Sequence, residues 1–179
     1  MKGAILIMGF IDTLKERAKA NVKTIVLPET EDKRTLAATE KILKEGIAKV
    51  ILVGNEEAVK KSAAEDGYDI SGAQIVDPAT SEKTQGYIDK LVELRQKKGM
   101  TPDQAKEILL NQYLYYGVMM VKMGDADGMV SGACHSTADT LRPCLQILKT
   151  KPGTKTCICI LLNGSSELRI WRKRRICIC

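Results

Sequence analysis

Apolar positions between residues 1 and 150 follow two alternating patterns. Charged segments with apolar residues three or four apart predict helices, and short β-branched runs that end at Pro, Gly or Asn predict buried strands. Strands that alternate with helices indicate βαβ units, so we expect an α/β fold with three αβα layers around a mainly parallel sheet. The predicted strands are 23–27, 49–53, 73–77 and 127–131, and the predicted helices are 10–20, 31–45, 56–66, 81–98, 101–123 and 137–149.

Local signals fix several of these boundaries. Gly46 supplies the C-terminal stop of the second predicted helix. Thr101 followed by Pro102 is typical of a helix start, with Thr as the cap and Pro in the first position. Ser136 or Thr137 caps the last predicted helix.

Composition changes this picture only near the end of the chain. The 179 residues carry a net charge of +6 and six cysteines, but residues 156–179 alone contribute +4 and four of the cysteines. The remainder is nearly neutral, and its two cysteines without a signal peptide indicate a cytoplasmic protein. An aromatic content of 4% argues against a nucleic-acid partner. The apolar run 4–10 is too short to span a bilayer, so we expect no membrane partner.

The most informative segment runs from Ala126 to Lys151. A hydrophobic strand ends at Ser131-Gly132, a loop of small residues follows, and a helix then opens. Free N–H groups and the positive dipole at a helix N-terminus favour anions, and Arg142 could hold a phosphate in a bidentate fork. The pattern therefore predicts an anion site, although an ordinary capped strand–helix connection explains it equally well. The hydroxyls that could add donors are Ser131, Ser136, Thr137 and Thr140.

Two other candidate features favour plain structural roles. His135 is the only histidine, and we interpret it as an ordinary loop residue because no partner at a fixed spacing supports a general base. Asp125, Asp127 and Asp139 could be read as a metal cluster, but acids are favoured in a first helical turn in any case. We therefore predict no metal site.

Five ordered segments resemble phosphate acetyltransferases, and the resemblance spans residues 9–155. The related butyryl enzymes share the fold but match these motifs less closely. The segments are DGMVSGACHSTADTLRPCLQILKTKPG at 127–153, LPETEDKRTLAA at 27–38, GIAKVILVGN at 46–55, IVDP at 75–78 and ELRQKKGMT at 93–101.

The resemblance implies reversible transfer of an acetyl group between coenzyme A and inorganic phosphate, in acetate and acetyl-CoA metabolism. Coenzyme A is then a substrate, and no tightly bound cofactor is expected. Arg142 and Arg95 look like residues that serve the phosphate or coenzyme A, although Arg95 could also be a surface charge on its helix. The residues that match the loop beside the family's cleft are Ser131, Gly132, Ser136, Thr137 and Thr140.

Family members are longer, homo-oligomeric and built from two domains. Their general-base aspartate and its partner serine lie in the second domain, so residues 9–155 correspond to an incomplete first domain. We therefore expect the 179-residue chain to lack catalytic activity and to be poorly soluble. The alternatives are a phosphate butyryltransferase-like acyltransferase and a non-catalytic fragment with a metal- or anion-binding tail.

Both ends of the chain depart from the family pattern. Residues 1–8 are expected to be a translated leader, because Lys2-Gly3-Ala4 can encode a ribosome-binding sequence before a start at Met8. Residues 156–179 are expected to be an out-of-frame tail. Read one base later, a permitted coding sequence for this tail gives ASAFFLMVVPNCEYGEKGVFVF, which resembles the family's continuation. The tail's own Cys-x-Cys pairs and basic block would otherwise suggest zinc or nucleic-acid binding.

Overall fold

The structure, a computed structural model, describes residues 2–150. Its centre is a four-stranded sheet in the order β3-β2-β1-β4, and every neighbouring pair is parallel. Because β1 pairs with both β2 and β4, the carboxyl ends of these strands meet at one edge of the sheet. The strands are β1 Lys23–Leu27, β2 Ala48–Val53, β3 Gln74–Val76 and β4 Gly128–Met129.

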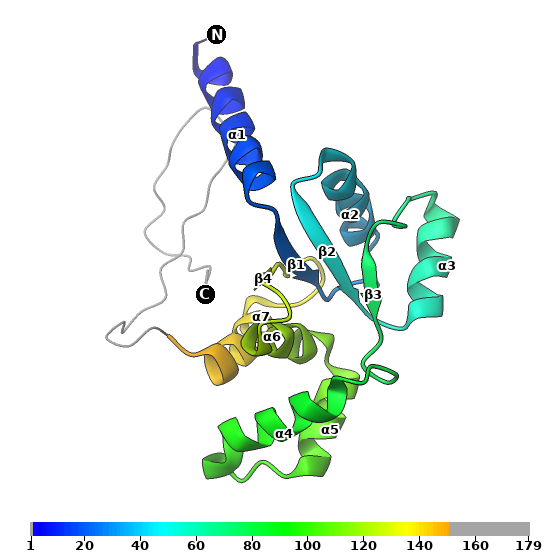
Figure 1. The fold of residues 1–179 in the computed structure, drawn as a ribbon, viewed down its shortest axis with the longest axis vertical. Helices are drawn as coiled ribbons and strands as arrows, with labels where there is room; N and C mark the ends of the chain where they lie inside the picture. Colours follow the sequence, from blue (N-terminus) through cyan, green and yellow to red (C-terminus); the bar gives the residue numbers. More distant parts are fainter. Residues whose placement is uncertain (1, 151–179) are drawn as a thin grey trace.

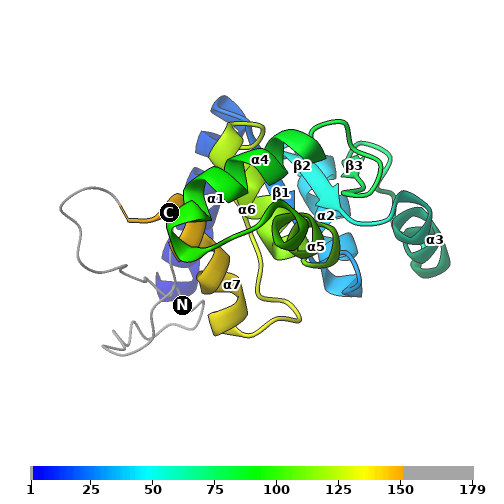
Figure 2. The same ribbon diagram turned by 90° about the horizontal axis from the view of Figure 1, so that it is seen from below.

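Helices cover both faces of this sheet (Figures 1 and 2). The helices α2 and α3 lie on one face, while α4, α5 and α6 lie on the other, and the predicted three-layer αβα fold is confirmed. The helix α1 projects away from the sheet, and an ion pair of 2.7 Å between Lys15 Nζ and Glu45 Oε2 ties it to α2. The α-helices are α1 Lys2–Ala20, α2 Lys33–Glu45, α3 Glu56–Asp66, α4 Thr84–Arg95, α5 Pro102–Asn111, α6 Tyr113–Met123 and α7 Thr137–Pro143. A 3-10 turn η1 spans Gln96–Lys98, and a π-helical turn η2 spans Cys144–Leu148.

Strand residues alternate between two hydrophobic clusters. Val26, Ile51 and Val53 pack with α4, α5 and α6. Leu27 and Leu52 pack with α2 and α3 instead. Both faces of each central strand are thus buried, and this explains why the strands read as continuous apolar runs.

The predicted caps are confirmed. Gly46 ends α2 in the left-handed conformation at φ 66°, where its N–H donates to two carbonyls of the last turn. Thr101 and Gln104 form a reciprocal capping box at the start of α5. Ser136 caps α7, and its Oγ accepts from the Asp139 N–H.

The predicted single helix over residues 101–123 is wrong, because the chain forms two helices that meet at Gln112. This residue adopts an extended conformation with φ −125° and ψ 90°. The helix α5 packs on α4, whereas α6 lies against β1 and β2, so the two helices need different directions. No Gly or Pro marks the break.

Several other boundaries differ from prediction, among them α4, predicted over 81–98 and observed over Thr84–Arg95, and two of them adjoin the candidate site. The strand β4 ends at Met129 instead of the predicted residue 131, because the chain then turns into the loop before α7. The last hydrogen bond to β1 runs from Val130 N to Val26 O over 3.0 Å. The helix predicted to run to residue 149 changes to π geometry after Pro143. Proline has no N–H to donate, and the closing bond runs from Lys149 N to Cys144 O.

None of the helices within residues 2–150 is long and apolar enough to cross a membrane. The predicted tail at 156–179 lies outside the described residues.

Candidate functional site

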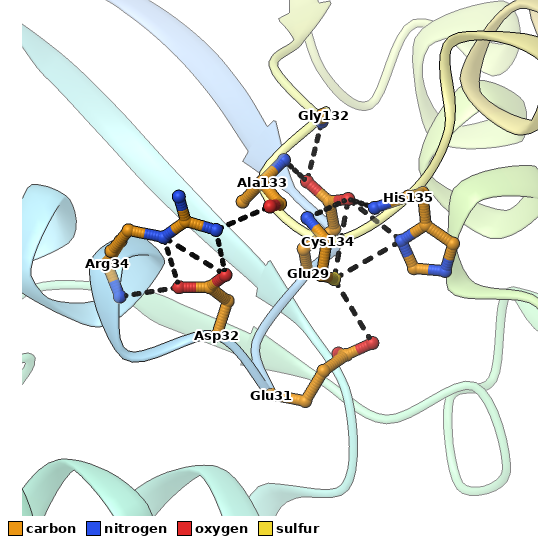
Figure 3. A network of polar contacts seen from close by, with 8 residues as sticks. All are labelled: Glu29, Glu31, Asp32, Arg34, Gly132, Ala133, Cys134 and His135. Atoms are coloured by element: carbon orange, nitrogen blue, oxygen red, sulfur yellow. Dashed lines mark hydrogen bonds and ion pairs between the residues drawn. The ribbon is translucent and has the colours of Figure 1, made fainter.

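The loop between β4 and α7 closes around one buried carboxylate (Figure 3). Glu29 follows β1 after Pro28, and only 1% of its surface is exposed. Its Oε2 accepts from Gly132 N at 2.6 Å and Ala133 N at 2.7 Å. Its Oε1 accepts from Cys134 N at 3.1 Å and His135 N at 3.0 Å. Four successive N–H groups therefore converge on a carboxylate from a distant part of the chain.

This arrangement determines the charge of Glu29. Burial raises its pKa, but hydrogen bonds from the Ala133 N–H, the His135 ring and the other loop N–H groups outweigh burial. Together they lower the pKa from 4.5 to about 2. At neutral pH these loop N–H groups thus bind the chain's own carboxylate and not an external anion.

Arg34 supports the same loop from its other side. Its Nη2 donates to the Ala133 carbonyl and to Asp32 Oδ2, while Asp32 Oδ1 caps α2 by accepting from Arg34 N at 2.8 Å. The loop is therefore fixed through both its N–H groups and one of its carbonyls (Figure 3).

The side chains of Cys134 and His135 also contact the Glu29 carboxylate. His135 Nδ1 lies 2.8 Å from Glu29 Oε1, and Cys134 Sγ lies 3.4 Å from His135 Nδ1. Burial and the neighbouring carboxylates of Glu29 and Glu31 raise the pKa of the Cys134 thiol to about 12. A thiol that stays protonated at neutral pH is a poor nucleophile. His135 is more than the ordinary loop residue that the sequence suggests, because it binds the buried carboxylate.

A pocket of about 450 Å³ opens beside this loop. Arg142 lines it from α7, with 59% of its side chain exposed and its Nη1 3.9 Å from Asp139 Oδ1. The opposite wall comes from the junction of α5 and α6, so the break at Gln112 shapes the pocket. The residues that line it are Glu31, Leu110, Asn111, Gln112, Tyr113, Leu114, Tyr115, His135, Asp139 and Arg142.

The charges of the two predicted arginines both lower the pKa of one tyrosine, Tyr115. Tyr115 donates to Gln146 Oε1 over 3.0 Å. Burial raises the Tyr115 pKa, and the positive charges of Arg142 and Arg95 oppose that rise. Arg95 does not line the pocket itself, but its positive charge lowers the pKa of Tyr115, which does.

The remaining predicted residues differ in their surroundings. Within residues 2–150, three buried side-chain polar atoms have no hydrogen-bond partner, and all three belong to predicted site residues. Ser136 is engaged as the α7 cap, and Thr137 is exposed in the first turn. Gly132, at φ 112°, gives its N–H to Glu29. The three partnerless atoms are Arg95 Nε, Ser131 Oγ and Thr140 Oγ1.

The three aspartates considered as a metal cluster bind separate partners in the described structure. Asp125 accepts from Tyr87 and Lys83. Asp127 accepts from Thr24 N and Lys23 Nζ, and Asp139 belongs to the α7 cap.

Sequence reasoning missed Glu29, Glu31 and Arg34 as individual residues. All three lie within the segment LPETEDKRTLAA, which carries part of the family resemblance, so the resemblance was the available signal. Local pattern gave none, because Glu29 and its partner Gly132 are 103 residues apart.

Comparison with known proteins finds relatives of one family. Residues 9–170 match the family described as phosphate acetyl/butaryl transferase. A phosphate acetyltransferase of Acetivibrio thermocellus is 55% identical over 148 residues, covering 83% of this chain and 44% of that protein. One of Clostridium acetobutylicum is 49% identical with the same coverage. The chain thus spans less than half the length of these relatives.

Two solved structures show the same fold. The EutD phosphotransacetylase from Staphylococcus aureus superposes with a TM-score of 0.77 at 41% identity, over 85% of this chain and 46% of that one. A phosphotransacetylase from Streptococcus pyogenes gives a TM-score of 0.79 at 38% identity, over 84% of this chain and 45% of that one.

Proposed function

The chain belongs to the phosphate acetyl/butaryl transferase family, and from that premise we propose that it forms the anion-binding wall of an acyltransferase site. The reaction is reversible transfer of an acetyl group between coenzyme A and inorganic phosphate. The relatives named above are phosphate acetyltransferases, and this favours acetyl over butyryl as the transferred group.

The observation that carries the proposal is the position of Arg142. Its exposed guanidinium lines a pocket of about 450 Å³, and the positive charge of Arg95, which lies outside the lining, also lowers the pKa of Tyr115 in that wall. Arginine binds phosphate oxygens in bidentate fashion. A guanidinium in the pocket wall, with a second positive charge nearby, suits an acyl phosphate or a phosphate group of coenzyme A.

The chemistry explains why positive charge is needed there. The thiol of coenzyme A gives up its proton to a base, and its sulfur forms a bond to the acyl carbonyl carbon. The bond from that carbon to the phosphate oxygen breaks, and phosphate leaves with the electron pair. Negative charge develops on the carbonyl oxygen and on the leaving phosphate, and a fixed guanidinium stabilises both. Cys134 and His135 are engaged with Glu29 and are not assigned a proton-transfer role.

Three further assignments belong to the same proposal. Coenzyme A acts as a substrate with no tightly bound cofactor, the protein works in the cytoplasm, and the longer protein is a homo-oligomer. The predicted lack of turnover by the 179-residue chain alone stays a prediction.

Binding measurements on the 179-residue chain test the proposal without requiring turnover. In calorimetric titrations with coenzyme A and with inorganic phosphate, we expect Arg142→Ala to weaken binding of at least one ligand by 10- to 100-fold, because a charge-assisted pair is lost (roughly 1.5–3 kcal/mol). Arg142→Lys keeps the charge without the fork and should retain part of the affinity.

Arg17→Ala is the matched control, since Arg17 lies exposed on α1 and lines none of the pocket that holds Arg142. Equal affinities for the parent chain, Arg142→Ala and Arg17→Ala would refute the assignment of Arg142 to an anionic substrate.

A further inference from the structure

Three side chains around the loop between β4 and α7 carry metal-binding atoms of different kinds, and these atoms lie close together. Glu29 Oε1, Cys134 Sγ and His135 Nδ1 all lie within 4.8 Å of one another. The separations are 3.5 Å from sulfur to carboxylate oxygen, 3.4 Å from sulfur to ring nitrogen and 2.8 Å from nitrogen to oxygen. Glu31 Oε1 lies 3.7 Å from the same sulfur (Figure 3).

We propose that Glu29, Cys134 and His135 form a binding site for a divalent cation of the zinc class, with the fourth position open to water. One thiolate, one imidazole and one carboxylate oxygen are ligands that zinc accepts, whereas magnesium and calcium require oxygen ligands. The argument for the site does not rest on the proposed acyltransferase function, although His135 also lines the pocket of Arg142.

The observed separations suit a tetrahedral ion. Bonds of roughly 2.0 Å to nitrogen and oxygen and 2.3 Å to sulfur place neighbouring ligand atoms about 3.3–3.6 Å apart. The two distances from Cys134 Sγ already match this spacing. His135 Nδ1 and Glu29 Oε1 must separate by about 0.5 Å. The His135 side chain can make this movement, because 37% of its surface is exposed.

Metal binding releases one proton from the site. In the metal-free loop, Cys134 Sγ and His135 Nδ1 can each donate a hydrogen to Glu29 Oε1. On metal binding the thiol releases its proton to solvent, and the neutral imidazole carries its hydrogen on Nε2 instead of Nδ1. One divalent cation thus replaces two hydrogens that face the same carboxylate oxygen.

The backbone prepares the site before any ion arrives. Glu29 is held by the four N–H groups of residues 132–135, so one ligand is charged, buried and fixed without metal. A preformed carboxylate lowers the ordering cost that metal binding must otherwise meet. Since His135 also lines the pocket of Arg142, the ion would lie at the wall of that pocket.

Cobalt(II) is a suitable probe, because a thiolate ligand gives it a charge-transfer band in the near ultraviolet. The tail would interfere, so the parent for the titration is the full 179-residue chain with its four tail cysteines changed to serine. We expect this parent to bind one equivalent of cobalt with a thiolate band, and zinc to displace it. The tail changes are Cys157→Ser, Cys159→Ser, Cys177→Ser and Cys179→Ser.

Variants in this parent assign the ligands. Cys134→Ala should abolish the thiolate band, and His135→Gln should weaken cobalt binding at least tenfold. Cys144→Ala is the matched control, because Cys144 is the other cysteine of the described chain, and it should leave both unchanged. Far-ultraviolet circular dichroism confirms that each variant is folded.

Two results would overturn the site: a tail-serine parent that shows no thiolate band at millimolar cobalt, or a band that persists in folded Cys134→Ala. Zinc should also raise the thermal midpoint of the parent but not that of Cys134→Ala. An equal shift in both would place the ion elsewhere.

Discussion

Glu29 connects two parts of the chain that are 103 residues apart, from β1 to the loop before α7. Because its pKa falls to about 2 in the folded protein from an ordinary 4.5, its ionised form stabilises the fold. The contribution is present above about pH 4.5 and is lost as the pH falls from there towards 2. A shift of this size corresponds to about 3 kcal/mol.

Glu29→Gln tests this residue directly. The substitution keeps the size of the side chain but turns an NH₂ group toward N–H donors of the loop, so we expect a loss of about 3 kcal/mol in the free energy of unfolding at pH 7. The difference from the parent should shrink below pH 4, where the parent loses its own advantage. Urea unfolding followed by circular dichroism, in a buffer with a chelator, provides the measurement.

Glu31→Gln is the matched control, because Glu31 is exposed and accepts no backbone hydrogen bond from the loop that holds Glu29. It should change the free energy of unfolding by less than about 0.5 kcal/mol. A Glu29→Gln variant as stable as Glu31→Gln at pH 7 would show that the buried carboxylate does not hold the loop. If Glu29→Gln does not fold at all while Glu31→Gln does, the structural role of Glu29 is supported.

At the scale of elements, the sequence predicts the bounds of a helix or strand where neighbouring residues alone determine where it begins and ends. The strand β1 and the helix α3 were predicted to the residue, because β-branched runs and glycine stops mark them. The break at Gln112 was not predicted, since it results from the packing of α5 and α6 on different partners. For the site, the sequence marked the loop before α7 but not its partner, because Glu29 reaches the loop only through the pairing of β1 with β4.

Gly117 shows how closely α6 packs on the sheet. A Cβ at this position would lie 2.8 Å from Met129 Sδ and 3.1 Å from Val26 Cγ1. Gly117→Ala gains about 1 kcal/mol of helix propensity but must displace a strand side chain, at a cost of roughly 1–3 kcal/mol. We therefore expect a net destabilisation of about 1 kcal/mol in urea unfolding.

Gly86→Ala is the control for helix propensity alone, because a Cβ at Gly86 in α4 would meet nothing within 4 Å. It should stabilise the protein by about 0.5–1 kcal/mol. If both substitutions stabilise the protein equally, α6 is not seated against β1 and β4 as the structure has it.

On the scale of the whole molecule, the side of the sheet that carries β4 exposes apolar surface. In the described sheet β4 has β1 as its only neighbour, and Val130 beyond it is 61% exposed. An apolar hollow of about 450 Å³ lies beside Val130, between β1 and α2. The projecting α1 leaves Ile11 46% and Leu14 42% exposed. Exposed apolar surface next to an unpaired strand edge promotes association between chains.

We therefore expect the 179-residue chain to self-associate through this side, and Val130→Lys to weaken the association. Removing an apolar contact of about 1.5 kcal/mol and adding a charge should raise the dissociation constant at least tenfold in sedimentation velocity over a concentration series. Met123→Lys is the matched control, since Met123 is 45% exposed but lies at the end of α6 and not on a strand. A parent chain that stays monomeric throughout the series would contradict the prediction, as would equal effects of the two lysines, because then the strand edge would not be the associating surface.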